Sequence, residues 1–282
     1  MRRTAAAALA LVAGLGACGG EDAAPVPGAD RAPPRGTFDV DGRAMYLECR
    51  GEGEPTVVLE AGLGVAGAGT WTAVLRPLAE TTRTCTYDRA GIGSSRPAAG
   101  RRTSDAMVRD LRALLAAAGV APPYVLVGAS FGGLNAQLMA ARHPDEVAGL
   151  VLLDSLHPDF DRRFAAVMGR AAARARARVV ADNPEGVRFE DQLASDAEVR
   201  AAGPLPPVPL RVLVHGVSFD PGGEPVPKLE RLWRALQRDL ARSSPRGELE
   251  IVPGTHHRIA EDDPDRVIRA VREVVDEVRA SG

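Results

Sequence analysis

Lysine and long apolar runs are both scarce in this 282-residue chain. Lys228 is the only lysine among 35 basic residues, and the formal net charge is −2. The arginines at 170–178 are interspersed with alanine, which indicates a solvated helix face. Nothing here predicts nucleic-acid binding, whose usual footprint is a basic stripe. The apolar stretch Ala5–Leu15 is too short for a transmembrane helix, which needs about 20 residues.

Metal-ligand spacings and dinucleotide-binding signatures are also missing. No group of His, Cys, Asp and Glu residues has the spacing of a metal site. The glycines between Gly62 and Gly69 lack the G-x-G-x-x-G spacing that precedes a helix in dinucleotide-binding folds. We therefore expect neither a metal nor a cofactor.

The first residues are typical of an export signal. Arg2 and Arg3 precede the apolar stretch, which ends in Leu-Gly-Ala-Cys at 15–18. This ending looks like a bacterial lipobox, in which the cysteine receives a lipid before cleavage. We expect a signal peptide over residues 1–17 and a lipid on Cys18. An ordinary secretory peptide cut elsewhere is the alternative.

The next segment has the composition of a linker. Residues 18–36 are rich in Gly, Pro, Ala and acidic residues and show no apolar periodicity, which predicts a flexible tether. The folded domain is expected over 37–282. Two or more acyl chains suffice for stable anchoring. We therefore expect the domain to be held on the extracytoplasmic face of the bacterial cell membrane.

Strand and helix signals alternate along this domain, which predicts an α/β fold with a mainly parallel sheet and helices on both faces. The segment between Leu153 and Leu210 lacks strand character, and an insertion of that length predicts a short lid over about 157–207. The expected strands are 37–40, 44–49, 56–60, 83–87, 124–128, 147–153, 210–215 and 248–252, and the expected helices are 71–80, 104–118, 131–142, 228–242 and 264–278.

The residues most informative about chemistry read Gly-Ala-Ser-Phe-Gly-Gly at 128–133. A strand is expected before them and a helix after them, which is the context that a G-x-S-x-G nucleophile turn requires. The sharp reversal exposes the serine oxygen, and the helix N-terminus beneath it offers N–H groups to a developing oxyanion. We predict that Ser130 is a nucleophile.

These segments together resemble the α/β-hydrolase family, most closely its exported bacterial members. The resemblance covers roughly 37–278 and implies a mostly parallel eight-stranded sheet. It also implies an oxyanion hole formed by the N–H groups of Leu63 and Phe131. The matching segments are Leu-Glu-Ala-Gly-Leu-Gly at 59–64, Tyr-Asp-Arg-Ala-Gly-Ile-Gly-Ser-Ser at 87–95, the nucleophile turn, Leu-Leu-Asp at 152–154, and His256-His257 to Asp263-Pro264.

The resemblance also implies a catalytic base and an acid. The family histidine lies seven residues before the proline that opens the last helix, which selects His257 over His256. The acid position that is commonest in the family follows the strand at 210–215, where Asp220 lies. Some members use the end of the preceding strand, where Asp154 lies. We favour Asp154 because a strand end positions a carboxylate better than a glycine-rich loop does, and Asp220 remains the alternative.

The expected function is hydrolysis of a carboxylic ester or related acyl bond in a small-molecule substrate, through a Ser-His-Asp triad and an acyl-enzyme. A catalytically silent binding protein with the same fold is the alternative.

The two remaining cysteines, Cys49 and Cys85, lie in expected strands. In the strand order that the family usually has, the second strand lies beside the fourth, so the two cysteines are expected to face each other and form a disulfide. Export would permit its oxidation. Two buried free thiols are the alternative if the register differs by one residue.

Overall fold

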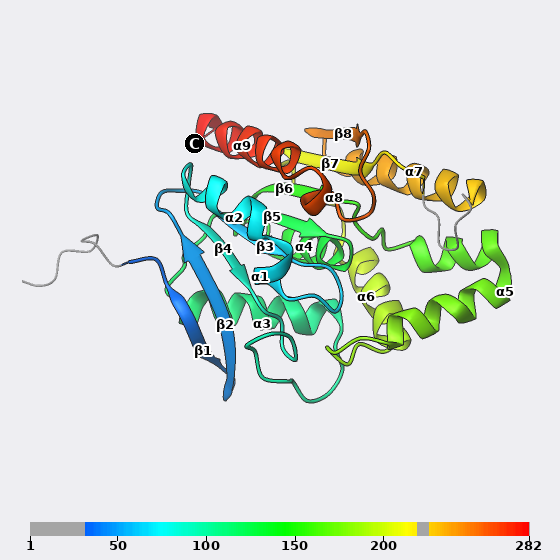
Figure 1. Cartoon of the computed structure of the whole chain (residues 1–282), viewed down its shortest axis with the longest axis horizontal. Helices are drawn as coiled ribbons and strands as arrows, with labels where there is room; N and C mark the ends of the chain where they lie inside the picture. The colour runs from blue at the N-terminus through cyan, green and yellow to red at the C-terminus, as the bar shows by residue number, and fades with distance from the viewer. Residues whose placement is uncertain (1–31, 219–225, 282) are drawn as a thin grey trace, which may run out of the picture. The chain divides into compact units, whose positions relative to one another are not determined.

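The computed structural model describes residues 32–218 and 226–281, and the fold below is that of the unit Pro33–Gly282. Figure 1 shows its strands side by side with helices on either face. Cys18, the signal peptide, most of the tether and Asp220 lie outside the described residues. The first strand begins at Arg35, two residues before the expected start of the domain.

The described strands form one sheet in the order β1-β2-β4-β3-β5-β6-β7-β8. β1 and β2 pair antiparallel, as do β2 and β4, and every other pairing is parallel. This is the mostly parallel eight-stranded α/β fold that the sequence predicts. The strands are β1 Arg35–Val40, β2 Arg43–Arg50, β3 Thr56–Glu60, β4 Thr84–Tyr87, β5 Tyr124–Ala129, β6 Val147–Leu153, β7 Leu210–His215 and β8 Gly247–Val252.

Two hydrophobic cores lie on the two faces of the sheet because alternate strand residues point in opposite directions. On β5, Leu126 belongs to the core under α3, α4 and α7, whereas Val125 and Val127 belong to the core under α2, α8 and α9. The described helices are α1 Gly67–Thr70, α2 Thr72–Ala79, α3 Ser104–Ala117, α4 Phe131–Arg142, α5 Phe160–Ala181, α6 Phe189–Ala202, α7 Pro227–Ala241, α8 Ile259–Asp262 and α9 Pro264–Ser281.

The helices α5 and α6 fill the segment between β6 and β7 and are called the insertion below. In Figure 1 they lie at one end of the sheet, where α5 packs against α7 and α6 packs against α4. Among the residues in the described ranges, no helix combines the length and the apolar character needed to cross a membrane.

A disulfide joins Cys49 on β2 to Cys85 on β4. The two residues are direct partners in the antiparallel register of these strands. Both side chains are buried. Because β4 also pairs with the parallel strand β3, the bond ties the antiparallel edge of the sheet to its parallel part.

Candidate active site

Ser130 occupies a sharp turn between β5 and α4. Its backbone has φ 52° and ψ −117°, a conformation that a residue with a side chain rarely adopts. Glycines on either side make the turn possible. A Cβ at Gly128 would lie 2.6 Å from the Gly133 Cα, and one at Gly132 would lie 2.4 Å from the Glu60 carbonyl oxygen. The turn therefore presents the serine at the carboxyl edge of the sheet, where open α/β folds bind ligands.

Two backbone N–H groups are available beside this serine. Phe131 is the first residue of α4. Its N–H has no acceptor within the helix, because the first N–H groups of an α-helix have no intrahelical partner. Leu63 lies in the loop after β3 and lines the same cavity as Ser130 and Phe131. Within the described ranges, neither N–H has a hydrogen-bond acceptor. A Cβ at Gly62 would lie 3.6 Å from the Ser130 Cβ, so the loop runs close to the serine.

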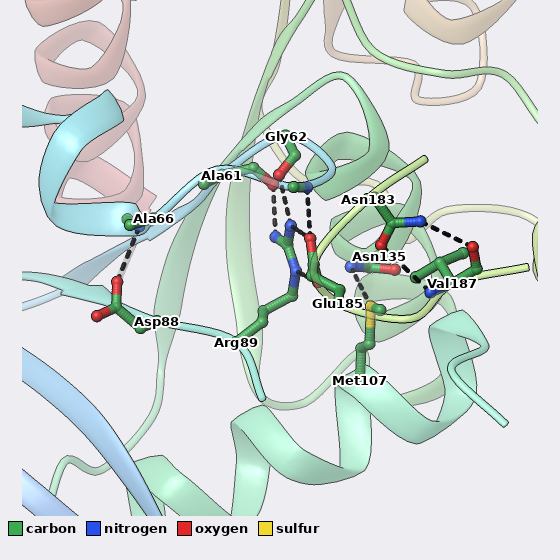
Figure 2. Close-up of polar contacts among 12 residues, drawn as sticks. Ala61, Gly62, Ala66, Asp88, Arg89, Met107, Asn135, Asn183, Glu185 and Val187 are labelled. Atoms are coloured by element: carbon green, nitrogen blue, oxygen red, sulfur yellow. Dashed lines mark hydrogen bonds and ion pairs between the residues drawn. The ribbon is translucent and has the colours of Figure 1, made fainter. Parts of the chain in front are cut away.

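Arg89 binds the loop after β3 through its carbonyl groups (Figure 2). Its guanidinium donates to the carbonyl oxygen of Ala61 at 2.6 Å and also to that of Gly62. Two of its nitrogens reach the two oxygens of Glu185 at 2.7 Å each. Glu185 in turn accepts the N–H of Gly64 at 2.6 Å. The loop after β3 is thus bound on both its carbonyl and its N–H groups.

The pair formed by Arg89 and Glu185 is buried, with side chains 3% and 0% exposed. Burial alone would raise the pKa of Glu185, but the charge and hydrogen bonds of Arg89, together with the Gly64 N–H, outweigh burial and lower it. Glu60 adds a second carboxylate at 3.0 Å from the guanidinium. Because Glu185 lies between α5 and α6, this pair fastens the insertion to the loop beside Ser130.

Asp154 follows β6 directly and has a positive φ of 43°. Its Oδ2 lies 2.8 Å from the Nδ1 of His257, and its Oδ1 accepts the indole N–H of Trp233 at 2.8 Å. Burial alone would raise the pKa of this carboxyl, but hydrogen bonds from His215 and His257 lower it to about 2. Asp154 is therefore an ionised acceptor at neutral pH.

The two neighbouring histidines of the loop after β8 point to different partners. His257 contacts Asp154 and lines the cavity, with a side chain 42% exposed. His256 has its ring 3.3 Å from Asp262, and its backbone N–H donates to the same carboxylate at 2.6 Å. No hydrogen bond joins Ser130 to His257 among the described residues. Catalytic hydrogen bonds are often loose before substrate binds.

His215 at the end of β7 is a site residue to which the sequence analysis gave no role. Its Nδ1 lies 2.6 Å from Asp154 Oδ2, and its Nε2 lies 3.1 Å from Glu230 Oε2. The sequence contains a signal for its position, because the carboxyl ends of adjacent parallel strands meet at the same edge of a sheet. The Asp154 N–H donates to the carbonyl of Leu213, so the two strand ends are neighbours.

Ser130, Asp154, His215 and His257 all line one cavity of about 490 Å³. That volume is within the usual range for a small-molecule site. Most of the other wall residues are apolar and come from the insertion and α7, for example Phe160, Phe164, Met168, Val179, Leu229 and Trp233. No group of three or more His, Cys, Asp or Glu residues in the described ranges could hold a metal ion.

Comparisons with known proteins identify relatives of this chain. The chain is 39% identical over 119 residues to the uncharacterized protein YqjL of Bacillus subtilis (strain 168), which is 42% of this chain and 47% of that protein. It is 40% identical over 151 residues to the pimeloyl-(acyl-carrier protein) methyl ester esterase of Chromobacterium violaceum, which is 53% of this chain and 54% of that protein. The chain thus spans about half the length of each of these two relatives.

A solved structure shares the fold. A thermophilic esterase from Thermogutta terrifontis superimposes with a TM-score of 0.56 and 22% identity, over 88% of this chain and 99% of that one. Residues 55–196, which run from β3 through the nucleophile turn into α6, match the family described as alpha/beta hydrolase fold. The chain belongs to the α/β-hydrolase-fold family.

Proposed function

We propose that this protein is a serine hydrolase that cleaves carboxylic esters or closely related acyl bonds. The observation that supports this most strongly is the contact of 2.8 Å between His257 Nδ1 and Asp154 Oδ2, at the wall of the cavity that also contains Ser130. A nucleophile, a base and an orienting acid in one cavity are the parts that acyl transfer requires.

In this proposal each group of the site has a distinct role. An ionised Asp154 can only accept, so His257 Nδ1 carries the proton of this hydrogen bond and Nε2 is left to accept another. Ser130 Oγ bonds to the substrate carbonyl carbon while its proton passes to His257 Nε2. The negative charge on the carbonyl oxygen is stabilised by the N–H groups of Leu63 and Phe131. Asp154 stabilises the imidazolium that forms.

The tetrahedral intermediate then collapses. The bond from the carbonyl carbon to the leaving oxygen breaks, and His257 gives its proton to that oxygen, releasing an alcohol. Water attacks the acyl-enzyme with His257 again as base, and the second collapse frees the acid and restores Ser130.

The cavity wall favours an apolar substrate. Aromatic and aliphatic side chains of the insertion and α7 supply most of the lining, and they would bury a hydrocarbon portion of the substrate. The relative from Chromobacterium violaceum is named as a methyl ester esterase, which agrees with ester chemistry. In this proposal the insertion acts as the predicted lid and decides which acyl or alcohol groups fit.

The proposed location is the extracytoplasmic face of the bacterial cell membrane. It is supported by the lipobox at residues 15–18 and the tether-like composition of residues 18–36. A lipid on Cys18 would hold the domain near the membrane, where apolar esters concentrate.

The test combines labelling with turnover. A fluorophosphonate should label the wild type but not Ser130→Ala, and that variant should lose ester hydrolysis by about 10⁴-fold or more, because the nucleophile acts as a unit with its base. His257→Ala should be similarly inactive, and His256→Ala is the matched control that should keep most of its activity. Hydrolysis of p-nitrophenyl esters of graded acyl length measures the activity of the wild type and of each variant. Labelling of Ser130→Ala, or an unlabelled wild type, would contradict the proposal.

A further inference from the structure

His215 differs from an ordinary site histidine because both of its ring nitrogens face carboxylates. Nδ1 lies 2.6 Å from Asp154 Oδ2 and Nε2 lies 3.1 Å from Glu230 Oε2. The ring is buried, with 3% of the side chain exposed. Ionised carboxylates only accept hydrogen bonds, and a neutral imidazole has only one N–H to donate. Both contacts are satisfied together when the ring carries two protons.

Each of the two carboxylates also accepts a hydrogen bond from a further donor. Asp154 also accepts the indole N–H of Trp233 at 2.8 Å, and its pKa is lowered to about 2. Glu230 accepts from Arg234 Nε at 2.5 Å. Burial alone would lower the pKa of His215, but the hydrogen bonds and charges of Asp154 and Glu230 outweigh burial and raise it.

The consequence for the site comes from a shared atom. His215 and His257 both direct Nδ1 to the same oxygen, Asp154 Oδ2. A positive charge on His215 would offset part of the Asp154 charge and oppose a second positive charge on His257. Arg176 of α5 also lines the cavity, but its guanidinium is bound by Asp161 at 2.9 Å.

We propose that His215 is a positioning residue of this site: an imidazolium held between Asp154 and Glu230, which orients the Asp154 carboxylate and restrains the protonation of His257. The proposal rests on the hydrolase function proposed above. The charged and titratable groups around it in the described ranges come from three elements. They are Asp154 after β6, Glu230 and Arg234 on α7, and His257 after β8.

The first measurement is a ¹⁵N NMR titration of the histidine rings in the purified full chain. The signals of His215 are those that disappear in His215→Asn. In the wild type both His215 nitrogens should stay protonated at pH values where a free histidine, with a pKa of about 6.5, is neutral. In Glu230→Gln, which removes one of the two charges, the ring should lose a proton at a lower pH than in the wild type. A neutral single tautomer of His215 in the wild type at pH 7 would overturn the proposal.

The second measurement reads the coupling to His257. In His215→Asn, the His257 ring should take up its second proton at a higher pH than in the wild type, and the acid limb of kcat/KM should move to higher pH with it. His256→Asn, an exposed histidine on the same loop, is the matched control and should leave both unchanged. Identical His257 titrations in wild type and His215→Asn would overturn the proposal. If His215→Asn does not fold, Glu230→Gln supplies the same comparison.

The two proposals fail separately. If the wild type hydrolyses no ester, the hydrolase function falls, whereas the NMR titrations still decide whether His215 restrains His257.

Discussion

Replacing Glu185 by glutamine should damage both stability and turnover, although Glu185 does not line the cavity. The carboxylate pairs with Arg89 through two contacts of 2.7 Å and accepts the N–H of Gly64. Breaking a buried ion pair costs about 3–5 kcal/mol because one charge is left uncompensated. Glu60 still lies 3.0 Å from the guanidinium, so the lower end of that range is expected, about 3 kcal/mol.

The expected effect on turnover arises because Arg89 and Glu185 hold the loop after β3, which carries the Leu63 N–H. Loss of one oxyanion donor costs about 10²–10³-fold in kcat, and a loosened Leu63 N–H should cost less, about 10–100-fold, with KM little changed. Urea unfolding and steady-state ester kinetics measure the two effects. The matched control is Glu190→Gln, which removes an exposed ion-pair partner from the same insertion and should change the unfolding free energy by about 1 kcal/mol or less. If Glu185→Gln behaves like this control in both assays, the insertion does not position the loop.

Three further predictions concern other parts of the chain. Cys49→Ser should lower the free energy of unfolding by about 4 kcal/mol in the chain-entropy account, because the disulfide closes a separation of 36 residues; two free thiols in the unreduced full chain, beyond any at Cys18, would contradict the bond. Burial, reinforced by the charge of Asp161, raises the pKa of Asp196 to about 8. The folded state therefore binds a proton that the unfolded chain releases near pH 4, so stability should fall as the pH rises from about 4 to 8, and Asp196→Asn should flatten this decline in a series of thermal melts. Cys18→Ser should release the protein from the membrane fraction or leave it unprocessed, and unchanged attachment and maturation would refute lipidation.

Local patterns in the sequence were enough to predict the sharp strand-to-helix turn at Ser130. The expected helix at 131–142 and strand at 147–153 have the bounds of α4 and β6, because the two glycines of the turn, the proline after His143 and the apolar run are all short-range signals. The strand order that places Cys49 opposite Cys85 needed the resemblance to the family, since nothing local in the two strands says which strands are neighbours.

The polar pairs that position the site were not predictable in the same way. Arg89 and Glu185 are 96 residues apart, and Glu185 lies in a segment with no motif. The double contact of His215 depends on where α7 places Glu230, which is a matter of helix packing and not of spacing along the chain. Asp154 was within reach of sequence reasoning because it ends a strand, whereas the four hydrogen-bond donors around it come from β7, α7 and the loop after β8.

Backbone strain gives an independent argument for the roles of Ser130 and Asp154. In the described ranges, the non-glycine residues with positive φ are Asp41, Ser130 and Asp154. Asp41 belongs to the Asp-Gly turn of the hairpin between β1 and β2, where that conformation is favoured. The other two follow β5 and β6 and line the same cavity. Each such residue costs of order 1 kcal/mol or more, and strain of this kind persists at sites where geometry serves function. The strain therefore favours Asp154 as the acid that orients His257.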